Sequence, residues 1–176
     1  NGQEVSISSK IPVAVSGGGF HTLVLMSNGE IYGCGRNTYG QLGLVAGAGT
    51  DNQLTLTPIT LGIVGKRPVA VSCGEYHTIV LMSDGELYSC GRDKYGNLGL
   101  GVDGTYQPTL TEITLIKETL NGQEVSISSK IPVAVSCGRY HTIVLMDNGE
   151  IYGCGYNYYG QLGLVAGAGT DNQLTL

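Results

Sequence analysis

Hydrophobic and polar residues follow the same order three times along the chain, over 13–44, 69–100 and 133–164. Each copy runs from Val-Ala-Val-Ser through His-Thr into an apolar stretch ending in Leu-Met, then past Asn-Gly or Asp-Gly into a second alternating stretch. Asn-Gly between two apolar runs is a strong hairpin signal, because the two-residue turn that matches strand twist needs positive φ at both central residues. The pattern therefore predicts one strand followed by a β-hairpin in every copy.

Two further alternating stretches, Gln53–Leu61 and Thr109–Ile116, predict a fourth strand. Pro58 lies inside the first stretch and Pro108 just before the second, which favours an outermost strand where a missing amide hydrogen is tolerated. Glycine-rich stretches such as 35–43 indicate loops, and no segment has convincing helical periodicity. We therefore expect an all-β fold of β-propeller blades, each of about four antiparallel strands. A β-solenoid is the alternative.

The repeat also sets the domain organisation. We expect a single repeat domain over 1–176, with units at about 1–56, 57–120 and 121–176. The first and third units are nearly identical, which indicates recent duplication or engineering and says little about a single active site. They differ at seven positions: Gly17/Cys137, Gly19/Arg139, Phe20/Tyr140, Leu23/Ile143, Ser27/Asp147, Arg36/Tyr156 and Thr38/Tyr158.

Charge and hydropathy argue against two classes of partner, with a local basic patch as the open alternative for nucleic acid. With 14 acidic and 9 basic residues the net charge is −5, and no cluster of basic residues is longer than Lys66-Arg67. Binding to a nucleic-acid backbone is therefore not expected. No window approaches the ~18 consecutive apolar residues of a membrane-spanning helix, so no membrane partner is expected.

The five cysteines are predicted to be buried free thiols rather than disulfides. Their number is odd, and Gly17 replaces one of them in the first unit without a matching change elsewhere. A zinc site is not expected, since no Cys-x-x-Cys occurs. Free thiols suit a reducing compartment, and the first residues lack the features of a signal peptide. We expect an intracellular protein, in the cytoplasm or the nucleus.

The three histidines, His21, His77 and His141, occupy equivalent positions and raise the alternative of a symmetric metal site. We expect instead that each ring hydrogen-bonds backbone groups inside its own blade. No Ser/His/Asp or Cys/His set stands apart from the repeat, and the glycines near Arg36 and Arg92 lack the strand-to-helix context of a phosphate loop. No catalytic residue, cofactor or metal is therefore expected, and the protein is predicted not to be an enzyme.

The ordered pattern at Cys73–Leu100 and Cys137–Leu164 resembles the repeat of the regulator of chromosome condensation family. The shared features are Cys-Gly-x-Tyr-His-Thr, the turn glycine, Tyr-x-Cys-Gly and the closing Gly-x-Leu-Gly-Leu. The resemblance implies β-propellers, commonly of seven blades, that serve mostly as interaction scaffolds. The founding member is a nucleotide exchange factor for a small nuclear GTPase and also binds chromatin.

Departures from the family pattern limit what can be carried over. Family repeats often have Trp where this chain has Cys34, Cys90 and Cys154, and the chain contains no Trp, so the tryptophan-based light sensing of the plant ultraviolet-B receptor is excluded. No residue matches the loops or the wedge that exchange activity requires. The hypotheses are a non-enzymatic scaffold for protein–protein interaction or assembly, a purely structural or designed repeat without ligand, and a guanine nucleotide exchange factor for a small GTPase.

Partner binding is predicted at the loops that flank the hairpins. Some positions there differ between the two similar units, and Tyr gives a large contact area at low entropic cost. Neutral drift after duplication is the alternative. The candidate residues are Arg36, Thr38, Arg92, Arg139, Tyr156, Tyr158 and Tyr159.

Three units are too few to close a propeller, which usually has ~4–8 blades. We expect a homodimer in which two chains, placed head to tail, form a closed ring of six units. Neighbouring repeats of a longer chain are the alternative.

Overall fold

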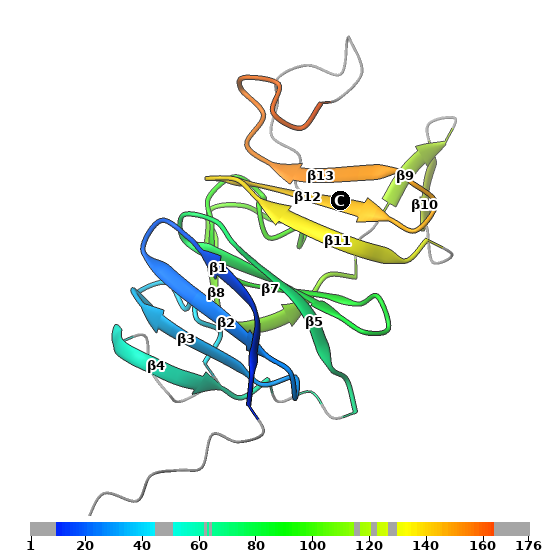
Figure 1. Cartoon of the computed structure of the whole chain (residues 1–176). Helices are drawn as coiled ribbons and strands as arrows, with labels where there is room; N and C mark the ends of the chain where they lie inside the picture. The colour runs from blue at the N-terminus through cyan, green and yellow to red at the C-terminus, as the bar shows by residue number, and fades with distance from the viewer. Residues whose placement is uncertain are drawn as a thin grey trace, which may run out of the picture.

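The computed structural model describes residues 10–44, 51–61, 63, 65–114, 117–120, 123–126 and 130–163. Within these residues the chain forms three antiparallel sheets of four, four and three strands, which follow one another in space as they do in sequence (Figure 1). The predicted all-β fold of propeller-like blades is confirmed. Blade 1 contains β1 (Pro12–Gly17), β2 (His21–Met26), β3 (Ile31–Gly35) and β4 (Gln53–Ile59). Blade 2 contains β5 (Pro68–Cys73), β6 (His77–Met82), β7 (Leu87–Asp93) and β8 (Thr105–Glu112). Blade 3 contains β11 (Pro132–Cys137), β12 (His141–Met146) and β13 (Ile151–Gly155).

Strands β9 (Lys117–Leu120) and β10 (Gln123–Ser126) form a separate two-stranded sheet, in the part of the sequence that connects blade 2 to blade 3. In the part of the chain that the structure describes, no helix is long and apolar enough to cross a membrane.

The strands of each blade pair in chain order, so the proline-containing strands β4 and β8 are outermost, as predicted. The prediction of Thr109–Ile116 for the second of them is wrong in its bounds, since β8 begins at Thr105 and ends at Glu112. The reason lies in its partner. Strand β7 runs on to Asp93, and its last two residues pair with Tyr106 and Thr105, whose polar neighbourhood gives no strand signal in the sequence.

The hairpins at Asn-Gly and Asp-Gly are confirmed, but their turns differ from the predicted two-residue type. The amide of Gly29 donates to the carbonyl of Met26 at 2.9 Å, and Met26 N–H donates to the carbonyl of Glu30 at 2.8 Å. Gly29 itself is left-handed, with φ at 87°. This is the three-residue hairpin connection, in which a tight turn is followed by one left-handed residue. Only the glycine position therefore requires positive φ.

The second strand of each blade, which we call its middle strand (β2, β6 or β12), has two faces that are buried by different neighbouring blades. In β6, all six residues are buried, whereas in β2 only the His and the two Leu positions are buried. In β12 the pattern is reversed, and the buried positions are Thr, Val and Met. We call the side of a blade that carries His21, Leu23 and Leu25, or their equivalents, its forward face. The side that carries the alternate residues, from Thr22 on, is its rear face.

Two hydrophobic cores lie between blades rather than inside them. The first joins the forward face of blade 1, through residues such as Leu23 and Ile31, to the rear face of blade 2, through Val80 and Met82. The second joins the forward face of blade 2 to the rear face of blade 3, with Leu81 and Leu87 against Val144 and Met146. Because each fully buried aliphatic side chain stabilises a fold by about 2 kcal/mol, these junctions are the main source of stability.

A glycine in the bend before each middle strand lets the histidine ring lie against the backbone. A Cβ added to Gly74 would lie 2.0 Å from Cε1 of His77 and 2.8 Å from the carbonyl oxygen of Gly138 in the next blade. Gly18 and Gly138 meet their own histidines in the same way.

We predict that Gly74→Ala destabilises the protein by about 3 kcal/mol, because the new methyl group must displace the buried ring of His77. Gly17→Ala is the matched control, since a Cβ at Gly17 meets nothing within 4 Å. Urea denaturation of both variants measures the difference. Equal midpoints for the two variants would show that the glycine contact is not required.

Candidate functional site

The loops that follow the hairpins lie at one end of the blades and have a fixed internal geometry. In the first loop, the buried side chain of Asn37 accepts a hydrogen bond from the amide of Leu42 at 3.0 Å, and Gly40 N–H donates to the carbonyl of Asn37. In the equivalent loops, the Oδ1 atoms of Asp93 and Asn157 accept hydrogen bonds from the amides of Leu98 and Leu162, respectively. These buried contacts give every blade a preorganised loop on which exposed side chains are mounted.

Aromatic rings from two blades meet at the loop end of the first junction. Phe20 of blade 1 stacks on Tyr76 of blade 2 with ring centroids 5.1 Å apart, and Tyr39 meets Tyr76 edge-on at 5.4 Å. The guanidinium of Arg36 lies within 5.3 to 5.7 Å of all three rings, and its Nε donates to the hydroxyl of Thr38. A cation over an aromatic face is attracted by the ring quadrupole, so this arrangement holds Arg36 in place.

The second junction repeats this arrangement with more tyrosine. Tyr95 of blade 2 meets Tyr140 of blade 3 at 5.3 Å, and Tyr156 lies 4.8 Å from Tyr95. Beyond them Tyr158 and Tyr159 pack edge to face at 5.0 Å and are 62% and 81% exposed. The equivalent of Tyr156 at the first junction is Arg92, whose guanidinium lies 4.9 Å from the Tyr39 ring. The change from Arg to Tyr thus replaces a cation–ring contact by a ring–ring contact.

Two more cations complete this surface. Lys94 lies over Tyr95 at 4.8 Å, and Arg139 lies over Tyr140 at 4.9 Å while forming an ion pair with Glu75 of blade 2. The Arg139 side chain holds the pKa of the Glu75 carboxyl below its usual range. Glu75 and Arg139 border a hollow of about 440 Å³ where the inner strands end, and half of the residues that line it are glycines. We call the whole set the loop surface, and its members are Phe20, Arg36, Thr38, Tyr39, Glu75, Tyr76, Arg92, Lys94, Tyr95, Arg139, Tyr140, Tyr156, Tyr158 and Tyr159.

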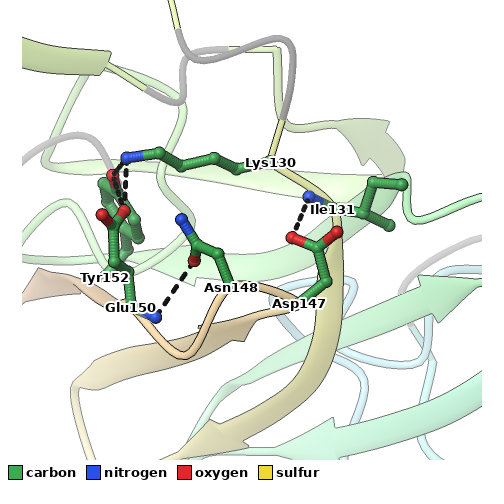
Figure 2. A network of polar contacts seen from close by, with 6 residues as sticks. All are labelled: Lys130, Ile131, Asp147, Asn148, Glu150 and Tyr152. Atoms are coloured by element: carbon green, nitrogen blue, oxygen red, sulfur yellow. Dashed lines mark hydrogen bonds and ion pairs between the residues drawn. The ribbon is translucent and has the colours of Figure 1, made fainter.

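At the opposite end of the blades each of the three lysines is paired with a glutamate, as Arg139 is with Glu75 on the loop surface. Figure 2 shows the turn of blade 3, where Lys130 pairs with Glu150 and donates to the Tyr152 hydroxyl at 2.8 Å. The Tyr152 hydroxyl also donates to Glu150, and Asp147 accepts the amide of Ile131. Lys10 with Glu30, and Lys66 with Glu86, repeat the ion pair in the other blades. The lysine holds the pKa of Glu150 low, as in blade 1 for Glu30.

All seven predicted partner-binding residues lie on the loop surface, but they form two groups. Arg36, Thr38 and Arg92 belong to the first junction, and the three tyrosines belong to the second. Arg139 connects blade 3 to Glu75. Sequence reasoning missed the other seven members of this surface: Phe20, Tyr39, Glu75, Tyr76, Lys94, Tyr95 and Tyr140. Tyr39 and Tyr95 are Tyr in every copy, so a search among varying positions could not find them. Phe20 and Tyr140 stand at a varying position but are aromatic in both units, and an aromatic residue before each His-Thr was the available signal.

The predicted hydrogen-bond partners of the histidines, backbone groups inside the same blade, are wrong. Nε2 of His21 lies 2.9 Å from the hydroxyl of Thr78 in the next blade, and Nε2 of His77 lies 3.2 Å from that of Thr142. The threonine hydroxyls in turn donate back to loop carbonyls of the preceding blade, on Gln41 and Asn97. The rings therefore bond across the junctions rather than inside their own blades, because the His position is on the forward face.

These rings are neutral at physiological pH. Burial lowers the pKa of His21 to about 4 and that of His77 to about 3. Among the described residues, no group of three or more His, Cys, Asp or Glu side chains is arranged to hold a metal ion.

The five cysteines are free thiols, as predicted, but the prediction that all are buried is wrong: Cys73, Cys90 and Cys154 are buried, whereas Cys34 and Cys137 are half-buried. Burial raises the pKa of Cys73 to about 11 and that of Cys137 to about 12, so both stay protonated at neutral pH. Their sulfurs donate to backbone carbonyls of Ser16 and Ser72 in the preceding blade.

Asp93 is the one loop-closing residue that carries a charge, and it is fully buried. Its Oδ1 accepts the Leu98 amide at 3.2 Å, while Oδ2 has no hydrogen-bond partner in the described part of the chain. Burial raises the pKa of this carboxyl from 3.8 to about 6, despite the opposing backbone hydrogen bonds. The folded protein therefore favours the neutral acid, and stability is lost as the pH rises from about 4 through about 6.

We predict that Asp93→Asn, which introduces the residue of both equivalent loops, stabilises the protein at pH 7.5 by up to about 3 kcal/mol and has little effect below pH 4. Thermal melts of the two proteins across this range measure the effect. Asp51→Asn, at an exposed position of the first unit, is the control for a general loss of acidic charge. A gain that is the same at every pH would contradict a buried ionised Asp93.

Comparison with known proteins places this geometry in a family. Residues 28–81 and 84–145 match the Regulator of chromosome condensation (RCC1) repeat, and a shorter form of that repeat matches 13–41, 69–97 and 133–161. The chain is 31% identical over 169 residues to Protein RCC2 homolog of Danio rerio, covering 89% of this chain and 33% of that protein. It is 36% identical to the ultraviolet-B receptor UVR8 of Arabidopsis thaliana, with 85% and 30% covered.

Solved structures show the same fold. Human WBSCR16 superposes with a TM-score of 0.73 at 25% identity, over 94% of this chain and 40% of that one. Prp20p from Saccharomyces cerevisiae, a protein that binds Gsp1p and histones, superposes at 0.72 with 21% identity, over 93% and 37%. The chain spans about a third of the length of the RCC2 relatives. With the repeat matched in all three blades, the chain belongs to the Regulator of chromosome condensation (RCC1) repeat family.

Proposed function

We propose that the chain is a non-enzymatic scaffold that binds a protein partner on its loop surface, and that the partner contributes carboxylates. The observation that carries the proposal is the gathering of Arg36, Arg92, Lys94 and Arg139 over aromatic rings at one end of a chain whose net charge is −5. At the other end the three lysines are paired with glutamates.

The composition of this surface supports a protein partner. Tyr and Arg are enriched among residues that dominate protein–protein binding energy, and Tyr offers a large contact area with only two rotatable side-chain bonds. The rings are held by each other and by the junction, so little conformational entropy is lost when a partner binds. Arg also presents a planar fork that matches a carboxylate.

The chemical groups of the blades support a non-enzymatic role. Cys73 and Cys137 are protonated and bonded to the backbone, so neither offers a thiolate nucleophile at neutral pH. His21 and His77 are buried at the junctions, and this burial lowers their pKa values well below neutrality, outside the range that suits a general base.

We predict that a labelled oligoglutamate peptide binds the chain, that salt weakens the binding, and that Arg92→Glu combined with Lys94→Glu reduces the affinity by about tenfold or more. Fluorescence anisotropy gives the dissociation constants. Lys66→Glu with Arg67→Glu makes the same charge change at the opposite end of the blades and should leave binding unchanged.

Two outcomes would overturn the proposal. Equal loss in both double variants would mean that only net charge matters and that the loop surface is not the site. Tighter binding of a labelled DNA duplex than of the peptide, at matched charge and salt, would identify a nucleic-acid surface instead.

A further inference from the structure

Three tyrosines of the third loop form a cluster of rings without a cation of its own. Tyr156 and Tyr158 lie nearly parallel, with ring centroids 6.3 Å apart and an interplanar angle of 19°. Tyr159 stands across both, at 75° to Tyr156 and 88° to Tyr158, with centroids 6.2 and 5.0 Å away. We call these three rings the tyrosine trio. Among the described residues, cations lie over rings in every blade but over none of these three.

The first junction contains the same arrangement of rings with a cation in place. Phe20 and Tyr76 are nearly parallel, at 13° and 5.1 Å, and Tyr39 stands across Tyr76 at 82° and 5.4 Å. The guanidinium of Arg36 lies 5.3 to 5.7 Å from all three ring centroids. The structure thus shows how two parallel rings and one perpendicular ring accommodate a guanidinium.

The sequence explains why the trio lacks such a cation. The third unit has Tyr156 where the first unit has Arg36, and Tyr158 where it has Thr38. The loop of blade 1 therefore supplies a guanidinium to the rings around it, whereas the loop of blade 3 supplies only rings. A cation over the tyrosine trio has to come from another molecule.

The trio is held in place by its own loop and by the second junction. Tyr156 N–H donates to the carbonyl of Tyr140 at 2.8 Å, and the Tyr156 ring packs on Tyr95 with centroids 4.8 Å apart. Tyr159 N–H donates to Oε1 of Gln161 at 3.0 Å. These contacts all lie within blades 2 and 3, so little side-chain entropy is lost when a ligand binds the rings.

The position of Tyr158 faces solvent in every blade. Tyr158 is 62% exposed, and the equivalent residues Thr38 and Lys94 are exposed as well. Blade 2, which carries Lys94, has a neighbouring blade on each side, so a neighbour does not cover this position. A side chain from another protein can therefore reach the trio.

A guanidinium fits the trio better than an ammonium. Both cations are attracted by ring faces, but the guanidinium is planar and weakly hydrated, so it stacks on aromatic rings at a smaller desolvation cost. Its N–H groups can also donate to the phenol oxygens. The net charge of −5 further favours a cationic group.

We propose that the tyrosine trio binds an arginine side chain of the partner protein, in the way that the rings of the first junction hold Arg36. Lys94 lies over Tyr95 and Tyr140, beside the trio, so a carboxylate next to that arginine would meet a cation. The inference rests on the proposed function for the partner and its carboxylates, and on the ring geometry alone for the arginine.

Nuclear magnetic resonance of the full chain with labelled tyrosine rings tests the arginine site by itself. Adding millimolar N-acetylarginine amide should shift the ring signals of the trio, which Tyr158→Phe helps to assign. The citrulline analogue, which has the same shape without the charge, should leave them unshifted. Absence of the shift with arginine, or equal shifts with citrulline, would refute the site whatever the oligoglutamate peptide does.

Peptide binding tests whether the arginine acts together with the carboxylates. Three versions of the labelled oligoglutamate carry one central arginine, lysine or citrulline, and anisotropy gives their affinities. The arginine peptide should bind about fivefold tighter than the citrulline peptide and tighter than the lysine peptide. Without a site for arginine the order reverses, because a positive charge weakens binding to a cationic surface. Equal affinity of the arginine and lysine peptides would contradict a guanidinium site.

Two variants at one exposed position locate the contact. Tyr158→Thr introduces the residue of the first unit and should abolish the preference for arginine, while the affinity for oligoglutamate without arginine changes less than about twofold. Tyr158→Phe is the matched control, since it keeps the ring and should keep the preference. A preference that survives Tyr158→Thr would show that the arginine binds elsewhere. Failure of oligoglutamate to bind, with the arginine shifts intact, would refute only the proposed function.

Discussion

The contact between successive blades is the interaction on which the rest of this structure depends. A single sheet of three or four strands has two apolar faces and cannot bury either of them by itself. In blade 2 the neighbouring blades bury both faces, so that every residue of β6 is buried. In blades 1 and 3 only one face is buried. The alternating burial along β2 shows that it is the forward face in blade 1, and that along β12 shows that it is the rear face in blade 3. The cores between blades, rather than a central core, hold the chain together.

The loop surface follows from the same contact. His21 and His77 each reach the threonine of the next blade, and that threonine donates to a loop carbonyl of the preceding blade, so hydrogen bonds link the junction to the loop. The aromatic rings then meet across the junction at the loop end, where Phe20 stacks on Tyr76. Because cations lie over these rings, the charge of the surface is positioned by the packing of the blades. The same contact that stabilises the fold also organises the surface proposed to bind a partner.

Much of the fold could be predicted because repetition reinforces weak local signals. The hairpins, the outermost strands with their prolines and the free thiols are all present. The turn type was predicted wrongly, since Asn-Gly suits both two-residue and three-residue connections and only the register of the strands decides. Strand β8 begins in a polar stretch that carries no apolar alternation, and its pairing with the end of β7 sets its start.

The candidate site was harder to predict because its geometry lies between blades. The histidine was assigned to its own blade, as sequence neighbours suggest, yet the middle strand directs it to the next one. Positions that vary led to Tyr156 and Tyr158. Of the rings that meet Tyr156, Tyr95 recurs in the repeat and Tyr140 changes only between Phe and Tyr, so neither was selected as a candidate. Which cation lies over which ring depends on side chains from two blades and cannot be read from one copy.

Native-state hydrogen exchange on the dilute monomer tests most directly whether contacts between blades stabilise this protein. Strands β2, β6 and β12 are each paired on both sides within their own sheets, so their backbone hydrogen bonds are alike and only the number of covering blades differs. The account predicts that the amides of β6 exchange slowest, through global unfolding, and that those of β2 and β12 exchange faster through partial opening. Equal protection in all three strands, or faster exchange in β6, would contradict it.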